Sequence, residues 1–415
     1  MGASSLDLAG MLEELGRVTD EPGRLTRTFL SPAMKRANRL VAGWMRTAGL
    51  KVRTDPVGNL VGRLAGTDPR AKTLLLGSHL DTVRDAGMLD GPLGVLLPIV
   101  ALAELRSRGV QLPFAVEVIG FSEEEGVRFA SAYLGSKGFC GQLKVGDLAL
   151  RDSEGVTVQA AIDRWHGGRG AVDARHLPKA AHRKSDLLGY LEVHIEQGPV
   201  LEARKLAVGV VSAIAGQSRF KLTWTGRAGH AGTTPMELRR DAFAGAAEFA
   251  VGVEAIARRT PGLVATIGAL EVTPGSANVI PGAVMHTLDV RHARDAARRS
   301  ALMEMGRLAT RIAGRRRLVR RWQRTQNHDA VACSPGLGAQ LERSVRAVQG
   351  RSIPLVSGAG HDGVVVSALA PVAMLFVRCR AGLSHHPAEF ASARDLQVAL
   401  DVTLDFLQRL ASAQA

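Results

Sequence analysis

Three side chains able to bind a metal follow one short apolar run in the first quarter of the chain. The run occupies residues 73–76, and His79, Asp81 and Asp90 come after it within the stretch 77–91. Imidazole and carboxylate are ligands that divalent metals prefer. On an extended chain, residues two apart point the same way, so the Asp81 carboxylate can orient the His79 imidazole. A polar turn after a core strand is the alternative interpretation.

Three further predicted strands end in the same kinds of side chain. The apolar runs 114–121, 188–193 and 372–377 precede, in that order, the acidic triplet 123–125, His194 and the stretch 382–389 with His385. Alternating strands and helices predict an α/β sheet, and ligands of such sheets gather at the carboxyl ends of the strands. Any one histidine taken alone could be structural. The four strand ends together indicate a metal site.

The elements that must position these strand ends are predicted from hydrophobic periodicity. Apolar residues recur at helical spacing in 34–45, which indicates an amphipathic helix. The stretch 52–64 predicts strands that a Pro-Val-Gly turn interrupts. A long apolar helix pattern runs from residue 94 to residue 105. These positions are predicted to form the core, without a chemical role of their own.

The pattern changes in the middle of the chain, which predicts two domains. Residues 215–326 alternate strand, helix, two strands and a second helix that is expected to end before the arginine-rich residues 315–321. We therefore expect a smaller inserted α+β domain at 215–326, within an α/β domain formed by 1–214 and 327–415. A chain of 415 residues is long enough for two cores.

The composition limits the classes of function. Apolar residues make up 46% and charged residues 22% of the chain, and no apolar run is long enough for a membrane span. The first residues lack the basic start and apolar stretch of a secretory signal, and Cys140, Cys333 and Cys379 are too scattered for a disulfide framework. A cytoplasmic protein is the expectation.

The net charge of +14 raises the question of a polyanionic partner. Aromatic residues are only 4% of the chain, which argues against a stacking surface for single-stranded nucleic acid. Solvated or subunit-facing helix surfaces are the simpler interpretation of the arginines. We expect neither a nucleic-acid partner nor a membrane, although a basic surface favours the approach of small anions.

Eight ordered motifs give the chain a resemblance to a known family. It resembles the amidohydrolase and carbamoylase branch of the two-metal aminoacylase-like peptidase family over nearly its whole length. The motifs, in chain order, are GSHLDTV, LDGPLGV, FSEEEGVRF, EVHIEQGPVLE, GHAGTTPM, NVIPG with TLDVRH, SGAGHDG and GLSHHPAE.

The resemblance implies a pair of zinc or manganese ions held by five residues. The implied ligands are His79, Asp90, Glu125, His194 and His385. Asp90 would bridge the ions, with His79 and His194 completing one position and Glu125 and His385 the other. Asp81 would be the partner of His79. The neighbouring His386 leaves open which of the two adjacent histidines is the ligand.

The same resemblance implies the catalytic and substrate-binding residues. Glu124 would be the general base, beside the ligand but free to take a proton, and Glu123 a local hydrogen-bond partner. His230 would stabilise the oxyanion, in its own chain or in a partner subunit. The implied substrate contacts are Asn278 and Arg291 at the carboxylate, and Gln197, Gly360 and His361 on the opposite side. Arg291 as a plain surface charge, and the segment around Gly360 as a plain turn, are the alternatives.

The implied activity is cleavage of a ureido (carbamoyl) C–N bond in a small carboxylate-bearing substrate. Allantoate is the first expectation, because stretches such as 27–32 and 374–380 are most similar to that type, and an N-carbamoyl-L-amino acid is the alternative. A catalytically silent binding protein on the same fold is a distant third, since all five ligand positions and Glu124 carry competent residues. The family also implies a homodimer and a lid or dimerisation role for the inserted domain.

Overall fold

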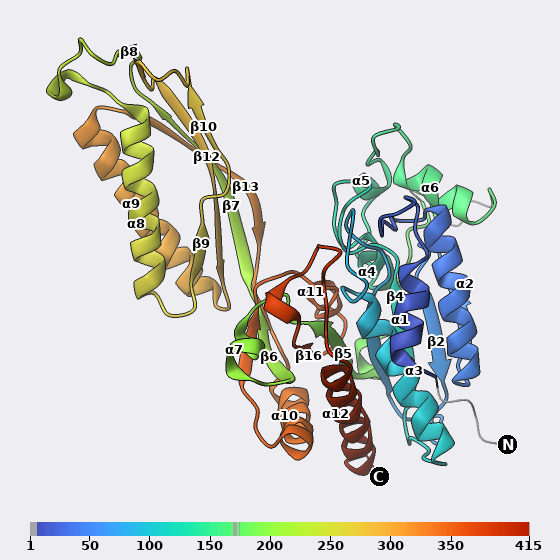
Figure 1. Ribbon diagram of the computed structural model, residues 1–415. Coiled ribbons are helices and arrows are strands. Elements are labelled where there is room, and N and C mark those ends of the chain that lie inside the picture. Colours follow the sequence, from blue (N-terminus) through green and yellow to red (C-terminus); the bar gives the residue numbers. More distant parts are fainter. Residues whose placement is uncertain (1–5, 169–171, 174, 415) are drawn as a thin grey trace. The chain divides into compact units, whose positions relative to one another are not determined.

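The computed structural model describes residues 6–168, 172–173 and 175–414. The chain divides into two compact units (Figure 1). The first contains the residues up to Ser212 and those from Cys333 onward, and the second is Ala213–Ala332. Each unit has its own sheet and its own buried core. No helix in the described part of the chain is both long enough and apolar enough to cross a bilayer.

The first unit is built on a mixed sheet of nine strands. Their order is β1-β2-β4-β3-β5-β16-β6-β14, with β15 beside β6. The four central strands β4, β3, β5 and β16 run parallel, while β2 and β6 pair with them in the antiparallel sense. This confirms the predicted α/β class with a mixed sheet. The strands are β1 Lys51–Thr54, β2 Leu60–Leu64, β3 Thr73–His79, β4 Ala115–Phe121, β5 Leu187–Ile195, β6 Val208–Ile214, β14 Val331–Ala332, β15 Pro354–Ser357 and β16 Val372–Val377.

Helices enclose this sheet. The helix predicted at 34–45 is confirmed as α2, which begins after Ser31, whose hydroxyl accepts a hydrogen bond from the Met34 amide. Strands β3, β4 and β16 are buried along their whole length, as expected for parallel strands covered on both faces. The helices are α1 Leu8–Gly16, α2 Pro32–Thr47, α3 Pro92–Ser107, α4 Leu134–Phe139, α5 Val145–Leu148, α6 Val158–Trp165, α7 Val200–Arg204, α10 Pro335–Gln349, α11 Gly363–Val366 and α12 Ala393–Ser412.

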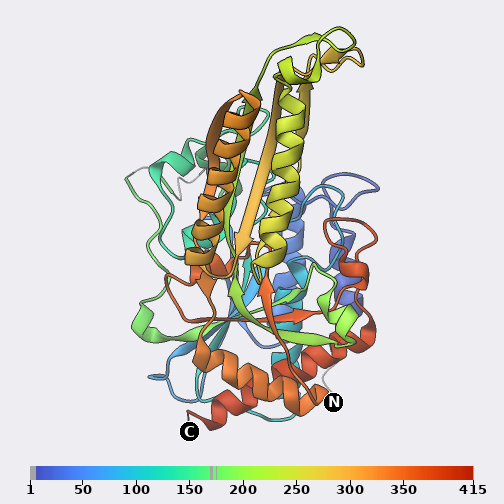
Figure 2. The ribbon, with the colours of Figure 1, turned by 90° about the vertical axis from the view of Figure 1, so that its left-hand side faces the viewer.

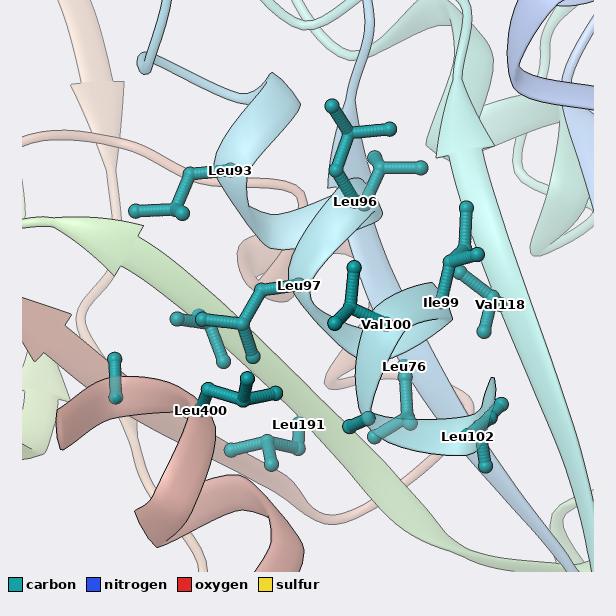
Figure 3. Close-up of a cluster of buried hydrophobic side chains, with 14 of the residues drawn as sticks. Leu76, Leu93, Leu96, Leu97, Ile99, Val100, Leu102, Val118, Leu191 and Leu400 are labelled. Atoms are coloured by element: carbon teal, nitrogen blue, oxygen red, sulfur yellow. The ribbon is translucent and has the colours of Figure 1, made fainter. Parts of the chain in front are cut away.

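The central helix α3 is apolar on nearly every side, which is why it is buried rather than amphipathic. Figure 3 shows Leu97 of α3 beside Leu400 of α12 and Leu191 of β5, in the main core of this unit. Gly94 lets the helix approach β5 closely, because a Cβ there would lie 2.2 Å from the Val193 carbonyl oxygen. Since α3 begins two residues after Asp90, this contact fixes where Asp90 lies.

The second unit has a five-stranded sheet, formed by β7, β9, β10, β12 and β13, with two helices on one face, and a separate two-stranded sheet, formed by β8 and β11. Figures 1 and 2 show α8 and α9 side by side across the five-stranded sheet. Alternate residues of β12 are buried against the helices, together with Trp224 and Phe249. The elements are β7 Gly216–Thr225, β8 Gly229–His230, α8 Ala242–Arg259, β9 Val264–Thr266, β10 Leu270–Thr273, β11 Val279–Ile280, β12 Ala283–His292, α9 Asp295–Arg316 and β13 Val319–His328.

Two expectations about this unit were wrong. Helix α9 does not end before the arginine-rich residues but continues to Arg316, and Arg317 ends it in the left-handed conformation. A further strand, β13, then pairs with β7 along its length. Arginine is a good helix former, and Glu248 of α8 accepts hydrogen bonds from both Arg315 and Arg316, which stabilises the extra turn.

Candidate metal centre

The four central strands of the first unit end at one edge of the sheet. They lie in the order β4-β3-β5-β16 and run parallel, so their carboxyl ends are neighbours. His79 is the last residue of β3, His194 is the penultimate residue of β5, and the acidic triplet follows β4 after Ser122. His385 comes from the loop after β16. The sheet therefore brings together the four strand ends that the sequence singled out.

Asp90 lies at the centre of these residues. Its Oδ1 is 3.6 Å from His79 Nε2 and 3.2 Å from His194 Nε2, and its Oδ2 is 3.2 Å from His385 Nε2. Glu125 Oε1 lies 3.6 Å from the same His385 nitrogen. In each of the groups His79–Asp90–His194 and Asp90–Glu125–His385, one ligand atom from every residue falls within 4.8 Å of the others. The five predicted ligands are thus assembled around one carboxylate.

The orientation of two imidazoles fits a bound cation. His79 Nδ1 lies 2.9 Å from the Asp81 carbonyl oxygen, and His194 Nδ1 lies 2.9 Å from the Ile195 carbonyl oxygen. A carbonyl only accepts, so each Nδ1 carries a proton, and in its neutral form the ring presents an Nε2 lone pair towards Asp90. His194 Nε2 is buried and has no hydrogen-bond partner among the described residues. Lone pairs and a carboxylate oxygen that converge in this way form a cation site.

The charges of the site also favour a bound cation. Burial alone would lower the pKa of His79, yet the neighbouring carboxylates of Asp81 and Asp90 raise that pKa well above its ordinary value. Burial raises the pKa of Glu125 to about 7, with the charge of Asp90 adding to the rise while His79 opposes it. Burial also raises the pKa of Glu124 well above its ordinary range. The site thus favours added positive charge, which a divalent ion would supply.

Asp81 does more than the sequence suggested. Its side-chain Oδ1 is 3.5 Å from His79 Nδ1, farther than the 2.9 Å of its own carbonyl oxygen. The Asp81 carboxylate instead accepts hydrogen bonds from the Glu124 amide at 3.0 and 3.1 Å and from the Glu125 amide at 3.2 Å. Asp81 therefore positions the main chain of both glutamates. The Glu124 carboxylate, 8% exposed, accepts no hydrogen bond from any described residue.

The structure separates the two adjacent histidines near the C-terminus. His385, in a left-handed backbone conformation with φ of 56°, directs its ring to Asp90 and Glu125. The His386 ring accepts a hydrogen bond from the Ala388 amide at 3.0 Å. His385 is therefore the one that joins the cluster, with its side chain half exposed at 50%.

The predicted contacts from the first unit lie beside the cluster. Gln197 donates to Asp90 Oδ2 at 2.8 Å. His361 is buried, with its ring centroid 4.5 Å from that of His194 and its Nε2 2.7 Å from the Ser357 hydroxyl. Gly360 leaves room for another side chain, because a Cβ there would lie 1.9 Å from the Tyr133 hydroxyl.

Two residues in the same place were not predicted. Ser384 Oγ lies 2.6 Å from Asp90 Oδ2 and 3.0 Å from Glu389 Oε2. Glu389 Oε1 accepts from the Leu89 amide at 2.8 Å and from the Asp90 amide at 3.1 Å. Both belong to the last quoted motif, and the only sequence signal was an acidic residue close behind the ligand histidine.

The predicted contacts from the second unit do not lie together. His230 in β8 pairs with Val279 of β11, and the Asn278 carbonyl accepts from the Ala231 amide at 2.9 Å, so His230 and Asn278 are neighbours. Arg291 is near the far end of β12, eight residues beyond Ala283, a separation of roughly 26 Å along a strand. Its guanidinium meets both oxygens of Asp289, at 3.0 and 2.9 Å.

Comparison with known proteins gives consistent matches. The sequence pattern of "Peptidase family M20/M25/M40" matches residues 75–409. An allantoate deiminase of Arabidopsis thaliana is 40% identical over 428 residues, covering 96% of this chain and 81% of that protein. An N-carbamoyl-L-amino acid amidohydrolase of Geobacillus stearothermophilus is also 40% identical, covering 97% and 98%. The solved structure of a hydantoinase/carbamoylase family amidase from Burkholderia multivorans matches with a TM-score of 0.90, 33% identity and 97% coverage of both chains.

Proposed function

The chain belongs to peptidase family M20/M25/M40, and from that premise we propose that it is a metal-dependent amidohydrolase of ureido (carbamoyl) C–N bonds. The proposed substrate is allantoate, which would give ureidoglycine, ammonia and carbon dioxide. The observation that carries the proposal is the convergence of three imidazoles and Glu125 on Asp90. The names and the near-complete coverage of the relatives support the class of substrate.

Two divalent ions, zinc or manganese, would be held by His79, Asp90 and His194 and by Asp90, Glu125 and His385. Bound there, such a pair polarises a carbonyl oxygen and makes water a nucleophile near neutral pH. Asp90 has one oxygen facing each set of ligands, which suits it to bridge them. Nitrogen and oxygen donors in this mixture suit either metal.

Glu124 is proposed as the general base. Its carboxylate has no hydrogen-bond donor among the described residues, while its amide is held by Asp81, so the group is fixed at the main chain and free at the reacting end. It would take a proton from the attacking water and deliver it to the leaving nitrogen. Burial raises the pKa of Glu124, which helps the carboxyl to retain the proton between these two steps.

We further propose that the inserted domain, 215–326, is a lid and dimerisation domain, with 1–214 and 327–415 as the catalytic domain. The division of the chain near Ser212 and Cys333 supports these boundaries. The segments that carry His230 and Asn278 adjoin the Ala283 end of β12, since Ala283 pairs with Thr225. Arg291 lies roughly 26 Å from Ala283 along that strand, so one small substrate could not touch both ends of β12 in a single chain. We therefore propose a homodimer, in which Arg291 from one chain and His230 and Asn278 from the other bind the same substrate.

Gln197, Gly360 and His361 complete the proposed substrate contacts on the side of the first unit. Gln197 and His361 lie against Asp90 and His194, and a small ligand above the ions would meet them. We propose the cytoplasm as the compartment, in keeping with three cysteines that are buried and unpaired.

The experiment that tests the substrate is a direct comparison. The purified protein, loaded with manganese or with zinc, is assayed for ammonia or amino-acid release from allantoate and from several N-carbamoyl-L-amino acids. Preference for allantoate in kcat/KM supports the proposal. Preference for an N-carbamoyl-L-amino acid replaces it with the second candidate, which the 98% coverage of the Geobacillus protein favours.

Mixing two inactive variants tests the shared site. Glu124→Gln and His230→Ala chains are co-expressed in equal amounts with different tags. Only if His230 acts across the dimer does a mixed dimer contain one site with both lesions and one site with neither. If His230 acts across the dimer, the mixture recovers about a quarter of wild-type activity. If it acts within its own chain, activity stays at the mean of the two variants.

A further inference from the structure

We infer that Glu389 is a positioning residue for the Asp90 carboxylate, the proposed bridging ligand. Glu389 accepts the hydrogen bond of the Ser384 hydroxyl when Asp90 binds metal ions. The inference rests on the proposed function only in requiring that Asp90 binds ions. Glu389 is 4% exposed and is not one of the proposed ligands. Its role follows from which groups surround its two oxygens.

One oxygen of Glu389 fixes the main chain of the bridging ligand. Oε1 accepts from the amides of Leu89 and Asp90 at 2.8 and 3.1 Å, across 300 and 299 residues of sequence. The carboxylate lies directly against the loop before Asp90, because a Cβ on Gly87 would come within 2.3 Å of the Glu389 side chain. The loop that carries Asp90 is therefore anchored to the loop that carries His385.

The other oxygen of Glu389, Oε2, faces the Ser384 hydroxyl, which has two possible acceptors. Ser384 Oγ is 2.6 Å from Asp90 Oδ2 and 3.0 Å from Glu389 Oε2, yet a hydroxyl has only one proton to donate. Asp90 Oδ2 also receives Gln197 at 2.8 Å and faces His385 Nε2 at 3.2 Å. An ion bound to Oδ2 must displace a donor from that oxygen. The Ser384 proton then turns to Glu389, which is the nearest alternative acceptor.

This arrangement predicts an unusual result for a conservative change. In Glu389→Gln the amide oxygen can still accept from the two backbone amides, but the amide nitrogen donates to Ser384 Oγ. The serine proton can then point only at Asp90, where it competes with the ion. We expect the weaker of two Mn²⁺ ions to bind about 10- to 100-fold less tightly. Adding Ser384→Ala removes the competing hydroxyl and should restore the affinity to within about threefold.

The experiment is a titration of the metal-free full-length protein with Mn²⁺ alone, followed by calorimetry and by the electron paramagnetic resonance signal of the bound pair. The matched control is Asp152→Asn. Asp152 likewise accepts two backbone amides on one oxygen, from Glu154 and Val156, and a side-chain donor, Arg128, on the other, but it is in none of the candidate metal groups. Asp152→Asn should bind two Mn²⁺ with wild-type affinity, and the unfolding temperature in excess chelator reports structural damage separately.

Two results would overturn the inference: wild-type affinity in Glu389→Gln, or no recovery in the double variant. If Glu389→Gln does not fold, Ser384→Ala alone decides. It should bind Mn²⁺ as tightly as wild type or more tightly, and a loss of tenfold or more contradicts the inference. A wild-type protein that binds fewer than two ions would instead refute the proposed function, so the two failures are distinguishable.

Discussion

In the first unit, Asp90 and Glu125 have only histidines as ion-pair partners among the described residues, whereas in the second unit Asp289 and Glu248 each meet two arginines. Burial raises the pKa of Glu125 to about 7. Burial alone would also raise the pKa of Asp289, but hydrogen bonds from Arg291 and Arg219 lower it. Asp289 and Glu248 are thus neutralised by arginines of their own unit, whereas Asp90 and Glu125 meet only imidazoles, an arrangement that favours an added cation.

The distribution of basic residues accounts for part of this difference. The second unit carries 19 arginine and lysine residues against nine aspartate and glutamate residues, a net +10 of the +14 of the whole chain. Its carboxylates are therefore surrounded by guanidinium groups, such as those that bind Asp289 and Asp295. Among the described residues, Asp90 and Glu125 have no arginine or lysine as an ion-pair partner, so carboxylates that meet only imidazoles mark the candidate site.

The strongest test of the comparison is the change Asp90→Asn. We expect it to abolish tight binding of the ion pair and to lower kcat/KM by more than about 10⁴-fold, because both proposed ion positions share this carboxylate. Metal content per chain and ammonia release are the measurements. Wild-type metal content in the variant would contradict the assignment of these carboxylates to a metal site.

The next largest effect is expected from Glu124→Gln. Loss of the proposed base should lower kcat by about 10²- to 10⁴-fold while two ions remain bound, because Glu124 belongs to neither proposed ligand set, although one of its oxygens lies within 4.8 Å of ligand atoms of His79 and Glu125. Metal content, kcat and KM are measured together. Full activity in this variant would remove Glu124 from the mechanism, and lost metal would make it a ligand instead.

The strand ends could be predicted from the sequence because apolar runs are followed by acidic residues and histidines, which are rarely buried in a hydrophobic core. Helix α2 was predicted because its apolar residues recur at helical spacing, and β1 and β2 were predicted as strands on either side of a Pro-Val-Gly turn. Strand β13 was missed because its sequence carries no alternation: only Trp322 and Gln326 are even partly buried in it. That strand forms through its pairing with β7 along the sheet edge, which a single stretch of sequence does not reveal.

Within the site, the residue types could be predicted from the sequence, but the directions in which the side chains point could not. His385 and His386 are chemically identical neighbours, and the left-handed backbone at His385 decides which ring meets Asp90. The roles of Ser384 and Glu389 depend on contacts with Asp90 across about 300 residues. Asp81 was identified, but its main contacts are with backbone amides, which carry no sequence signature.

A smaller effect is expected from Arg291→Lys in the second unit. The Arg291 guanidinium donates to both oxygens of Asp289. A lysine cannot reproduce this bidentate geometry or bind a substrate carboxylate through two parallel hydrogen bonds. We expect KM to rise about 10- to 100-fold with metal content unchanged. An unchanged KM would make Arg291 a purely structural ion pair, like its neighbours.

The smallest effect is expected on the pH dependence of stability in the second unit, where Glu248 pairs with two arginines. Burial alone would raise the pKa of Glu248, but hydrogen bonds from Arg315 and Arg316 lower it. A carboxyl whose pKa is lower in the folded state stabilises the protein above its unfolded pKa of about 4.5, and this stabilisation is lost as pH falls through the folded pKa. The side chain is 30% exposed, so we expect Glu248→Gln to cost about 1 kcal/mol at pH 7 and almost nothing at pH 3. Thermal unfolding at the two pH values measures this loss of stability.

The stability difference between Glu248→Gln and the wild type should be the same with and without Mn²⁺, because arginines of its own unit neutralise this carboxylate. The stability change caused by Asp90→Asn should instead depend on the metal. If adding metal changed the Glu248→Gln difference, the two units would not be electrostatically independent.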